Sequence, residues 1–114
     1  MELINLTPHE VKIVGDNGNV IASILSSGVA RASQQDIPVD SIEFGEVSIP
    51  VVKTEFGEVT DLPGPTEGVA FIVSIITLNA AKAVGRSVED LLITSNPVRD
   101  GEGKIIGCRA LAHA

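Results

Sequence analysis

The stretch "GVAFIVSIITLNAAKAVG", residues 68–85, contains the two most clearly patterned segments of the chain. Its first part, up to Val73, is an almost unbroken apolar run, which is typical of a buried strand. Its second part is rich in helix-forming residues and has no proline. Ser74 is suited to cap the start of a helix, and Gly85 is suited to end it. The stretch therefore predicts a buried strand followed by a helix from Ser74 to Val84.

The predicted helix is apolar around most of its circumference, and only Asn79, Lys82 and Arg86 form a polar stripe. Such a helix is usually buried on two sides. The chain has 114 residues, enough for one domain, and its core must be small because it lacks Trp and Tyr. We therefore expect a single domain over residues 1–114 and a homo-oligomer in which another subunit covers the helix.

Upstream of this stretch, alternating apolar and polar residues predict several strands. Two such runs flank the turn "DNGN", in which Asn-Gly favours a tight turn, so residues 10–25 are expected to contain a β-hairpin. The sequence "VARAS", residues 29–33, predicts a further strand. In that strand Arg31 would face away from the small residues Ala30 and Ala32, which suggest close packing behind it.

The pentapeptide "EFGEV" occurs twice, at residues 43–47 and 55–59, and is interpreted as two similar strand–Gly–strand segments. Each glycine is expected to mark a bulge or a bend, and Pro50 favours an edge position for its strand. Together these patterns predict an α+β fold, a small, mainly antiparallel β domain with one or two helices.

Downstream, the stretch "ITSNPVRDGEGKIIGCR", residues 93–109, predicts a strand that stops at a polar ledge, a turn, and a last strand. The ledge is Thr94-Ser95-Asn96-Pro97, and the last strand carries Arg109. The preceding "SVEDLL" is expected to form a short turn or helix that leads into the first of these strands.

The net charge of −7 argues against binding to DNA, RNA or an anionic membrane, because these partners need a broad basic surface. A small phosphate ligand remains compatible, since it needs only a few converging cations. Cys108 is the single cysteine, the first residues lack the pattern of a signal peptide, and no apolar run is long enough to span a bilayer. We therefore expect a cytoplasmic protein.

No residue pattern in the chain specifies a catalyst, a cofactor or a metal. His9, Cys108 and His113 lack the spacing of a zinc site, so a structural role or a solvated terminus is favoured for the histidines. No Gly-x-Ser-x-Gly or Walker sequence occurs. The protein is therefore predicted not to be an enzyme, and no cofactor or metal is expected.

The candidate ligand-binding residues are polar groups near the arginines. Arginine matches phosphate with a planar fork, whereas in an acidic chain it also finds salt-bridge partners easily. Arg99 is expected in a turn and in solvent. The predicted ligand-binding residues are Arg31, Thr94, Ser95, Asn96 and Arg109.

Six segments that cover most of the chain, in order, carry a resemblance to known proteins. They are "INLTPHEVKIV", "GVARAS", "TEFGEVTDLP", "FIVS", "NPVRD" and "GKIIGCRAL". On these segments the sequence resembles a group of short phage proteins, and within it the Thoeris anti-defence sponges. The resemblance implies a β-rich protomer with two helices, assembled as a hexamer. It also implies binding of a cyclic ADP-ribose isomer, made by a TIR-domain enzyme, which is withheld from its effector. Some members also capture cyclic oligonucleotides at a separate site.

The ligand pocket of the family uses arginine, asparagine and an aromatic ring. Arg31 and Arg109 resemble its arginine positions, and Asn96 resembles its asparagine position. The aromatic ring has no counterpart, because no Phe, Tyr or Trp lies between the predicted helix and the last strand. The guanidinium plane of Arg109 is one substitute for stacking on a base.

Two other functions stay open at this stage. A structural or assembly protein of a phage or mobile element would have no small-molecule affinity. A small hydrolase of unknown class would turn its ligand over, whereas a sponge would release it intact on denaturation.

Overall fold

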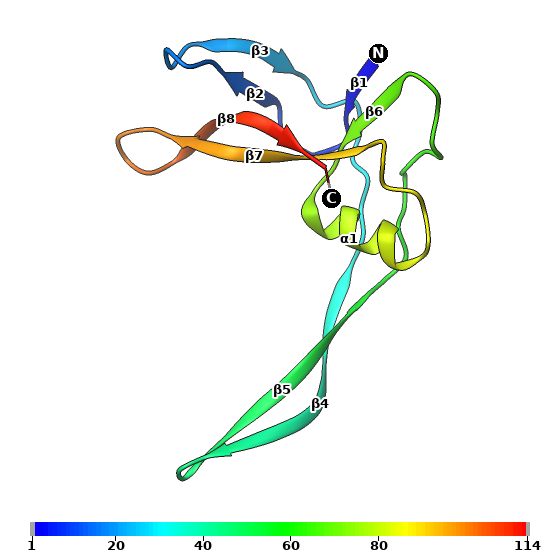
Figure 1. Ribbon diagram of the computed structural model, residues 1–114, viewed down its shortest axis with the longest axis vertical. Helices are drawn as coiled ribbons and strands as arrows, with labels where there is room; N and C mark the ends of the chain where they lie inside the picture. Colours follow the sequence, from blue (N-terminus) through cyan, green and yellow to red (C-terminus); the bar gives the residue numbers. More distant parts are fainter. Residues whose placement is uncertain (1, 114) are drawn as a thin grey trace.

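The computed structural model describes residues 2–113 (Figure 1). Six strands form one mixed sheet in the order β1-β6-β7-β8-β2-β3, and two form a separate sheet. The predicted α+β fold, a small and mainly β domain, is confirmed, although β1–β6, β6–β7 and β2–β8 pair in parallel. The elements are β1 (Glu2–Asn5), β2 (Val11–Val14), β3 (Val20–Ile24), β4 (Gln34–Phe44), β5 (Val47–Phe56), β6 (Val69–Ile72), α1 (Ile75–Ala83), β7 (Leu91–Arg99) and β8 (Ile105–Ala112).

The β6–α1 unit has the arrangement that the sequence predicts. Ser74 caps the helix, and its hydroxyl accepts a hydrogen bond from the backbone N–H of Thr77 at 3.2 Å. Gly85 follows the helix with a φ of 85°, a left-handed conformation that costs glycine little. The helix therefore begins and ends where its capping residues place it.

The sheet carries apolar side chains on both faces, because successive residues of β6 point in opposite directions. Phe71 and Val73 pack with Leu78 of the helix in one cluster of buried residues. Ile72 packs with Cys108 in a second cluster. The helix covers the first cluster.

Helix α1 is buried along one side only within the single chain. Its buried residues are Thr77, Leu78, Ala80 and Ala81. Ile75 is 51% exposed, and Val84, just after the helix, is 66% exposed. The second covered side that the sequence predicts is therefore open in this chain. Within residues 2–113, no helix is long and apolar enough to cross a membrane.

Three local predictions need correction. The segment 29–33 is not a strand: it is extended and makes one isolated bridge, from Arg31 to Thr60. The strand expected to stop at the Thr94–Pro97 ledge continues as β7 to Arg99, because its pairing with β8 resumes after Asn96. One helix, not the two that the resemblance implies, is present among residues 2–113, since "SVEDLL" forms a turn and the start of β7.

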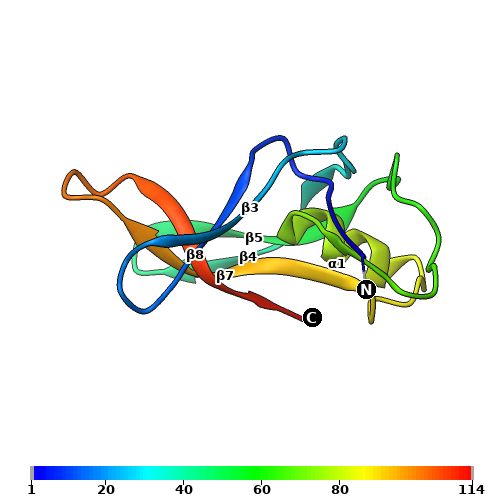
Figure 2. The same cartoon turned by 90° about the horizontal axis from the view of Figure 1, so that it is seen from above.

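The remaining feature is a long hairpin that projects from the body (Figure 1) and lies behind it in the view from above (Figure 2). Strands β4 and β5 pair antiparallel from Gln34–Phe56 to Phe44–Val47 and turn at Gly45, which has a φ of 63°. Among the described residues they pair with no strand of the main sheet. We call this hairpin, residues 34–56, the arm. The predicted edge position of the strand that contains Pro50 is confirmed, because both strands of a two-stranded sheet are edge strands.

Candidate functional site: an arginine pocket beside helix α1

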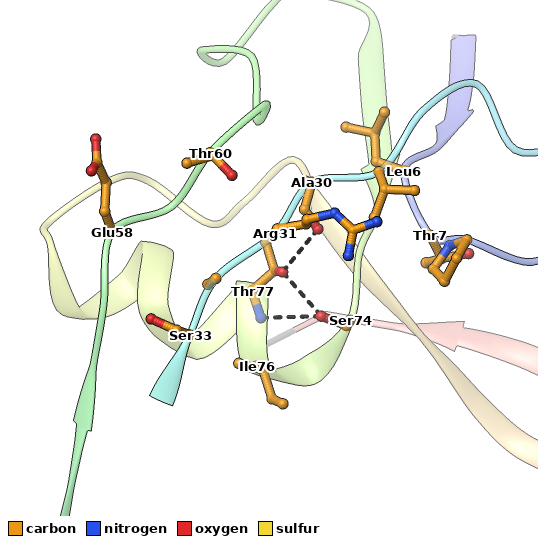
Figure 3. A pocket seen from close by; sticks show the side chains of 13 residues that line it. Leu6, Thr7, Ala30, Arg31, Ser33, Glu58, Thr60, Ser74, Ile76 and Thr77 are labelled. Carbon is orange, nitrogen blue, oxygen red and sulfur yellow. Dashed lines mark hydrogen bonds between the residues drawn. The ribbon is translucent and has the colours of Figure 1, made fainter. Parts of the chain in front are cut away.

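A hollow of about 530 Å³ lies between the start of helix α1, the turn after β1 and the two segments that lead into and out of the arm (Figure 3). We call it the Arg31 pocket. It is lined by Leu6, Thr7, Pro8, Val29, Ala30, Arg31, Ala32, Ser33, Glu58, Thr60, Ser74, Ile76 and Thr77.

Backbone contacts on several sides fix the position of Arg31. Its N–H donates to the carbonyl of Thr60 at 3.0 Å, and its carbonyl accepts from the N–H of Thr60 at 2.8 Å. The preceding residue, Ala30, is buried, and its N–H donates to the carbonyl of Leu6 at 3.0 Å. The carbonyl of Ala30 also accepts from the hydroxyl of Thr77 at 3.3 Å. Arg31 lines the pocket, but Ala30 and Ala32 line it too, so the strand-like alternation that the sequence predicts for this segment does not hold.

The guanidinium group of Arg31 has no ion-pair or hydrogen-bond partner among residues 2–113. The other arginines of this part of the chain are engaged. Arg86 pairs with Asp90, Arg99 donates to the carbonyl of Gly103 at 2.8 Å, and Arg109 donates to the carbonyl of Gly15 at 2.9 Å. Glu58 lines the same pocket as Arg31, but its carboxylate points away from the guanidinium (Figure 3). Arg31 is thus the arginine with its donors available.

The start of helix α1 adds positive potential to this pocket. Ser74, Ile76 and Thr77 belong to its first turn and line the pocket. No acidic residue lies in that first turn, so the partial positive charge of the helix N-terminus is not neutralised within it. Hydroxyl groups of Thr7, Ser33 and Thr60 and the carboxylate of Glu58, which points away from Arg31, complete the polar part of the lining. The combination of an arginine, a helix N-terminus and hydroxyls suits an anion.

A fully buried asparagine holds the turn that forms one wall of the pocket. The amide Nδ2 of Asn5 donates to the carbonyls of His9 at 2.8 Å and Ile24 at 2.9 Å. Its Oδ1 accepts from the N–H of Thr7 at 2.9 Å and from the hydroxyl of Thr7 at 2.6 Å. The hydroxyl of Ser26 donates to the carbonyl of Thr7 at 2.7 Å. These bonds explain the "Asn-Leu-Thr-Pro-His" segment, because they fix the turn at Thr7 and tie it to β3.

A second hollow, of about 620 Å³, lies between β7, β8, the start of β2 and the start of helix α1. We call it the Ile106 groove. Its apolar lining includes Ile75, Pro97 and Ile106, and the predicted site residue Thr94 also lies there. Thr7 and Ser74 line both the Ile106 groove and the Arg31 pocket, so the two hollows are neighbours.

The structure separates the remaining predicted residues from Arg31. Ser95 pairs with Ala110 across β7 and β8, and the register places Asn96 opposite Arg109. Asn96 has a φ of 53°, an uncommon conformation that interrupts the regular pairing. Ser95, Asn96 and Arg109 line neither hollow. Within one chain, Thr94 therefore lies in the groove next to the Arg31 pocket, whereas Asn96 and Arg109 form a separate pair of neighbours.

The ion pair of Arg86 and Asp90 has a structural role, because it connects two segments of the chain. Arg86 donates to both carboxylate oxygens of Asp90, at 2.8 and 2.9 Å, and to the carbonyls of Pro63 and Ser87. The side chains of the pair are 15% and 13% exposed. The hydrogen bond from Arg86 lowers the pKa of Asp90 below its ordinary value of 3.8, against the opposing effect of burial. The pair ties the segment after the arm to the connection between α1 and β7.

Sequence patterns predict Arg31 as a site residue and Ser74 as the helix cap, but they do not predict that the two residues line the same pocket. Thr7, Ser33 and Thr60 come from three separate segments, and only the folding of those segments around the arm brings them together. No group of three His, Cys, Asp or Glu side chains within residues 2–113 is arranged to hold a metal ion. Comparison with family models, with curated proteins and with solved structures finds no match for the chain.

Proposed function

We propose that the protein is a phage anti-defence protein that binds a cyclic nucleotide immune signal and sequesters it without degrading it. A cyclic ADP-ribose isomer is the first candidate ligand, and a cyclic oligonucleotide is the second. The observation that carries the proposal is the Arg31 guanidinium, which lacks a partner among residues 2–113 and lies beside the uncompensated N-terminus of α1. The resemblance to the Thoeris sponges supports the same class of ligand and a homo-oligomer, with a hexamer as its form, in the host cytoplasm.

The pocket suits a phosphorylated small molecule in both charge and size. In a chain of net charge −7, a phosphate needs a local concentration of positive potential, which Arg31 and the helix provide. A volume of about 530 Å³ lies within the usual range for small-molecule sites. Because no aromatic residue lines the pocket, a base would lie against aliphatic walls such as Leu6, Val29 and Ile76.

The use of the pocket hydroxyls supports sequestration without turnover. The hydroxyl of Ser74 accepts from the backbone of Thr77 and donates to its side chain at 3.0 Å. No histidine or cysteine is among the residues that line the pocket, so no hydroxyl there has a histidine base beside it. We therefore propose that a bound nucleotide leaves the pocket chemically unchanged.

Residues of the Thr94–Pro97 ledge and Arg109 can reach a ligand in the Arg31 pocket only from another subunit. Ser95, Asn96 and Arg109 lie outside the Arg31 pocket of their own chain, so we propose that they contact the ligand across a subunit interface.

A release experiment tests the proposed function. The protein is incubated with a panel of cyclic ADP-ribose isomers and cyclic oligonucleotides, washed, heated, and the released compounds are identified by mass spectrometry. We expect one panel member to be retained and released intact by the wild type. Retention should fall for Arg31→Ala but not for Arg99→Ala, which removes an arginine outside the pocket. Conversion of the ligand at a rate proportional to protein concentration would instead establish an enzyme.

One observation favours a second candidate, a phage structural or assembly protein. The arm projects from the body and carries exposed apolar residues, as an assembly element would. This function predicts that assembly persists while the wild type retains none of the panel.

A further inference from the structure

We propose that the arm of one chain docks by its apolar face into the Ile106 groove of a second copy of the chain. This inference does not rest on the proposed ligand, because it concerns other surfaces.

The outer half of the arm has one apolar face and one polar face. Cross-strand partners point to the same face, and successive pairs alternate between the two faces. The pairs Phe44–Val47 and Ile42–Ile49 lie on one face, and the next pair on that face is Asp40–Val51, which adds one carboxylate at the inner end. The intervening pairs, Glu43–Ser48 and Ser41–Pro50, lie on the other face.

The apolar face is uncovered in the single chain. Phe44 is 75% exposed, Ile42 and Val47 are each 58% exposed, and Ile49 is 44% exposed. An isolated two-stranded hairpin is marginally stable in water, and a contiguous exposed apolar patch marks an interaction surface. A two-sided pattern on a free hairpin therefore indicates that another surface covers its apolar face.

The edges of the arm are less suited to association than its face. Pro38 lies in β4 and Pro50 in β5, and proline has no N–H to donate to an added strand. Lys53 and several acids also lie along the strands, and charged residues blunt strand edges. Face-to-face docking is therefore favoured over the addition of a further strand.

The Ile106 groove offers a complementary apolar surface on the body. Ile75, Ile105 and Ile106 line it and are 51%, 54% and 47% exposed. The arm cannot cover this groove in its own chain, because it extends away from the main sheet (Figure 1). An apolar face and an apolar groove that cannot meet within one chain can meet between two copies.

Charge distinguishes this arrangement from pairing of two arms. The acids of the arm outnumber its single lysine, Lys53, so two arms placed face to face would repel. The acidic and basic side chains that line the groove are His9, Glu10 and Lys12, with a single acid among them, so the groove has no excess of negative charge. The acids of the arm are Asp36, Asp40, Glu43, Glu46 and Glu55.

The area of such a contact is small for each arm and doubles when the exchange is reciprocal. The apolar face spans five residues of β5, Val47–Val51, or about 17 Å, and two strands are about 10 Å wide, so this face covers about 170 Å². Counting both partners gives about 340 Å² for each arm, and two exchanged arms bury about 680 Å², the size of a weak interface. Exchange of both arms is a two-fold contact, which a dimer or a hexamer with dihedral symmetry can contain.

Native mass spectrometry of face-specific variants tests the proposal. Ile42→Ser combined with Phe44→Ser should convert the oligomer to monomers at micromolar concentration. Glu43→Ser, on the opposite face, should leave the assembly intact. Circular dichroism should show the same fold for both variants, since the arm lies outside the two buried clusters. A monomeric wild type, or a double variant with the wild-type mass, would overturn the proposal.

Disulfide trapping tests the identity of the surfaces. Cys108 is replaced by Ala, and Phe44→Cys or Ile106→Cys is added to separate chains, which are then refolded together and oxidised. We expect a covalent dimer in the mixture and not in either chain alone. A covalent dimer of the Phe44→Cys chain alone would instead show that arms pair with arms. Absence of any covalent dimer in the mixture would also overturn the proposal.

Discussion

Replacement of Asn5 by Ala tests how the polar turn at the pocket is held. Asn5 is fully buried and makes four hydrogen bonds, two donated and two accepted. At about 0.5–1.5 kcal/mol for each bond, their loss amounts to about 2–6 kcal/mol. Thr7 is half-buried and His9 exposed, so water can reach part of the turn. We therefore expect the free energy of unfolding to fall by about 2–4 kcal/mol.

Urea denaturation followed by circular dichroism measures this loss. The matched control is Asn17→Ala, because the side chain of Asn17 accepts one hydrogen bond, from Asn19, at an exposed turn. The control should change the free energy of unfolding by less than about 1 kcal/mol. If Asn5→Ala were no more destabilising than Asn17→Ala, the Asn5 bonds would not be what holds the turn.

Two further variants test the Arg86–Asp90 ion pair and the close packing of Gly107 in β8. Above the unfolded-state pKa of Asp90, near 3.8, the ion pair with Arg86 contributes its full stability, and this is lost as pH falls through the lowered folded-state pKa. The free energy of unfolding of Asp90→Asn should therefore be lower than that of wild type at neutral pH, and this difference should shrink in acid. A difference in the free energy of unfolding that is independent of pH from 2 to 7 would contradict this. Gly107→Ala would bring a Cβ within 2.9 Å of the carbonyl of Lys12, and should destabilise by about 1–3 kcal/mol in thermal unfolding. Gly64→Ala, which meets open space, is the control, and equal melting temperatures for the two variants would refute the clash.

Local patterns in the sequence predict the β6–α1 unit well, because the cap at Ser74, the stop at Gly85 and the apolar run act over a few residues. The β2–β3 hairpin follows in the same way from its Asn-Gly turn. The continuation of β7 to Arg99 was missed because β8 supplies hydrogen-bond partners past a residue pair, Asn96-Pro97, that favours a turn locally.

The Arg31 pocket could be predicted only in part. Arg31 was predicted as a site residue from its chemistry and from the small residues that flank it. Its neighbours Thr7, Thr60 and Ser74 are far apart in the sequence and meet through long-range pairings, such as the bridge from Arg31 to Thr60. The arm was not predicted as a projecting element, since its alternation looks like that of any half-buried strand.

Calorimetry with cyclic ADP-ribose isomers and cyclic oligonucleotides, on wild type, Arg31→Ala and Arg99→Ala, tests most directly whether Arg31 binds the ligand. A charge-assisted hydrogen bond contributes roughly 1.5–3 kcal/mol, so Arg31→Ala should weaken binding by about ten-fold to a hundred-fold. Arg99→Ala should bind like wild type, because Arg99 is engaged with Gly103 outside the pocket. A wild type that binds no member of the panel, or an Arg31→Ala variant that binds as tightly as wild type, would contradict a ligand site at Arg31.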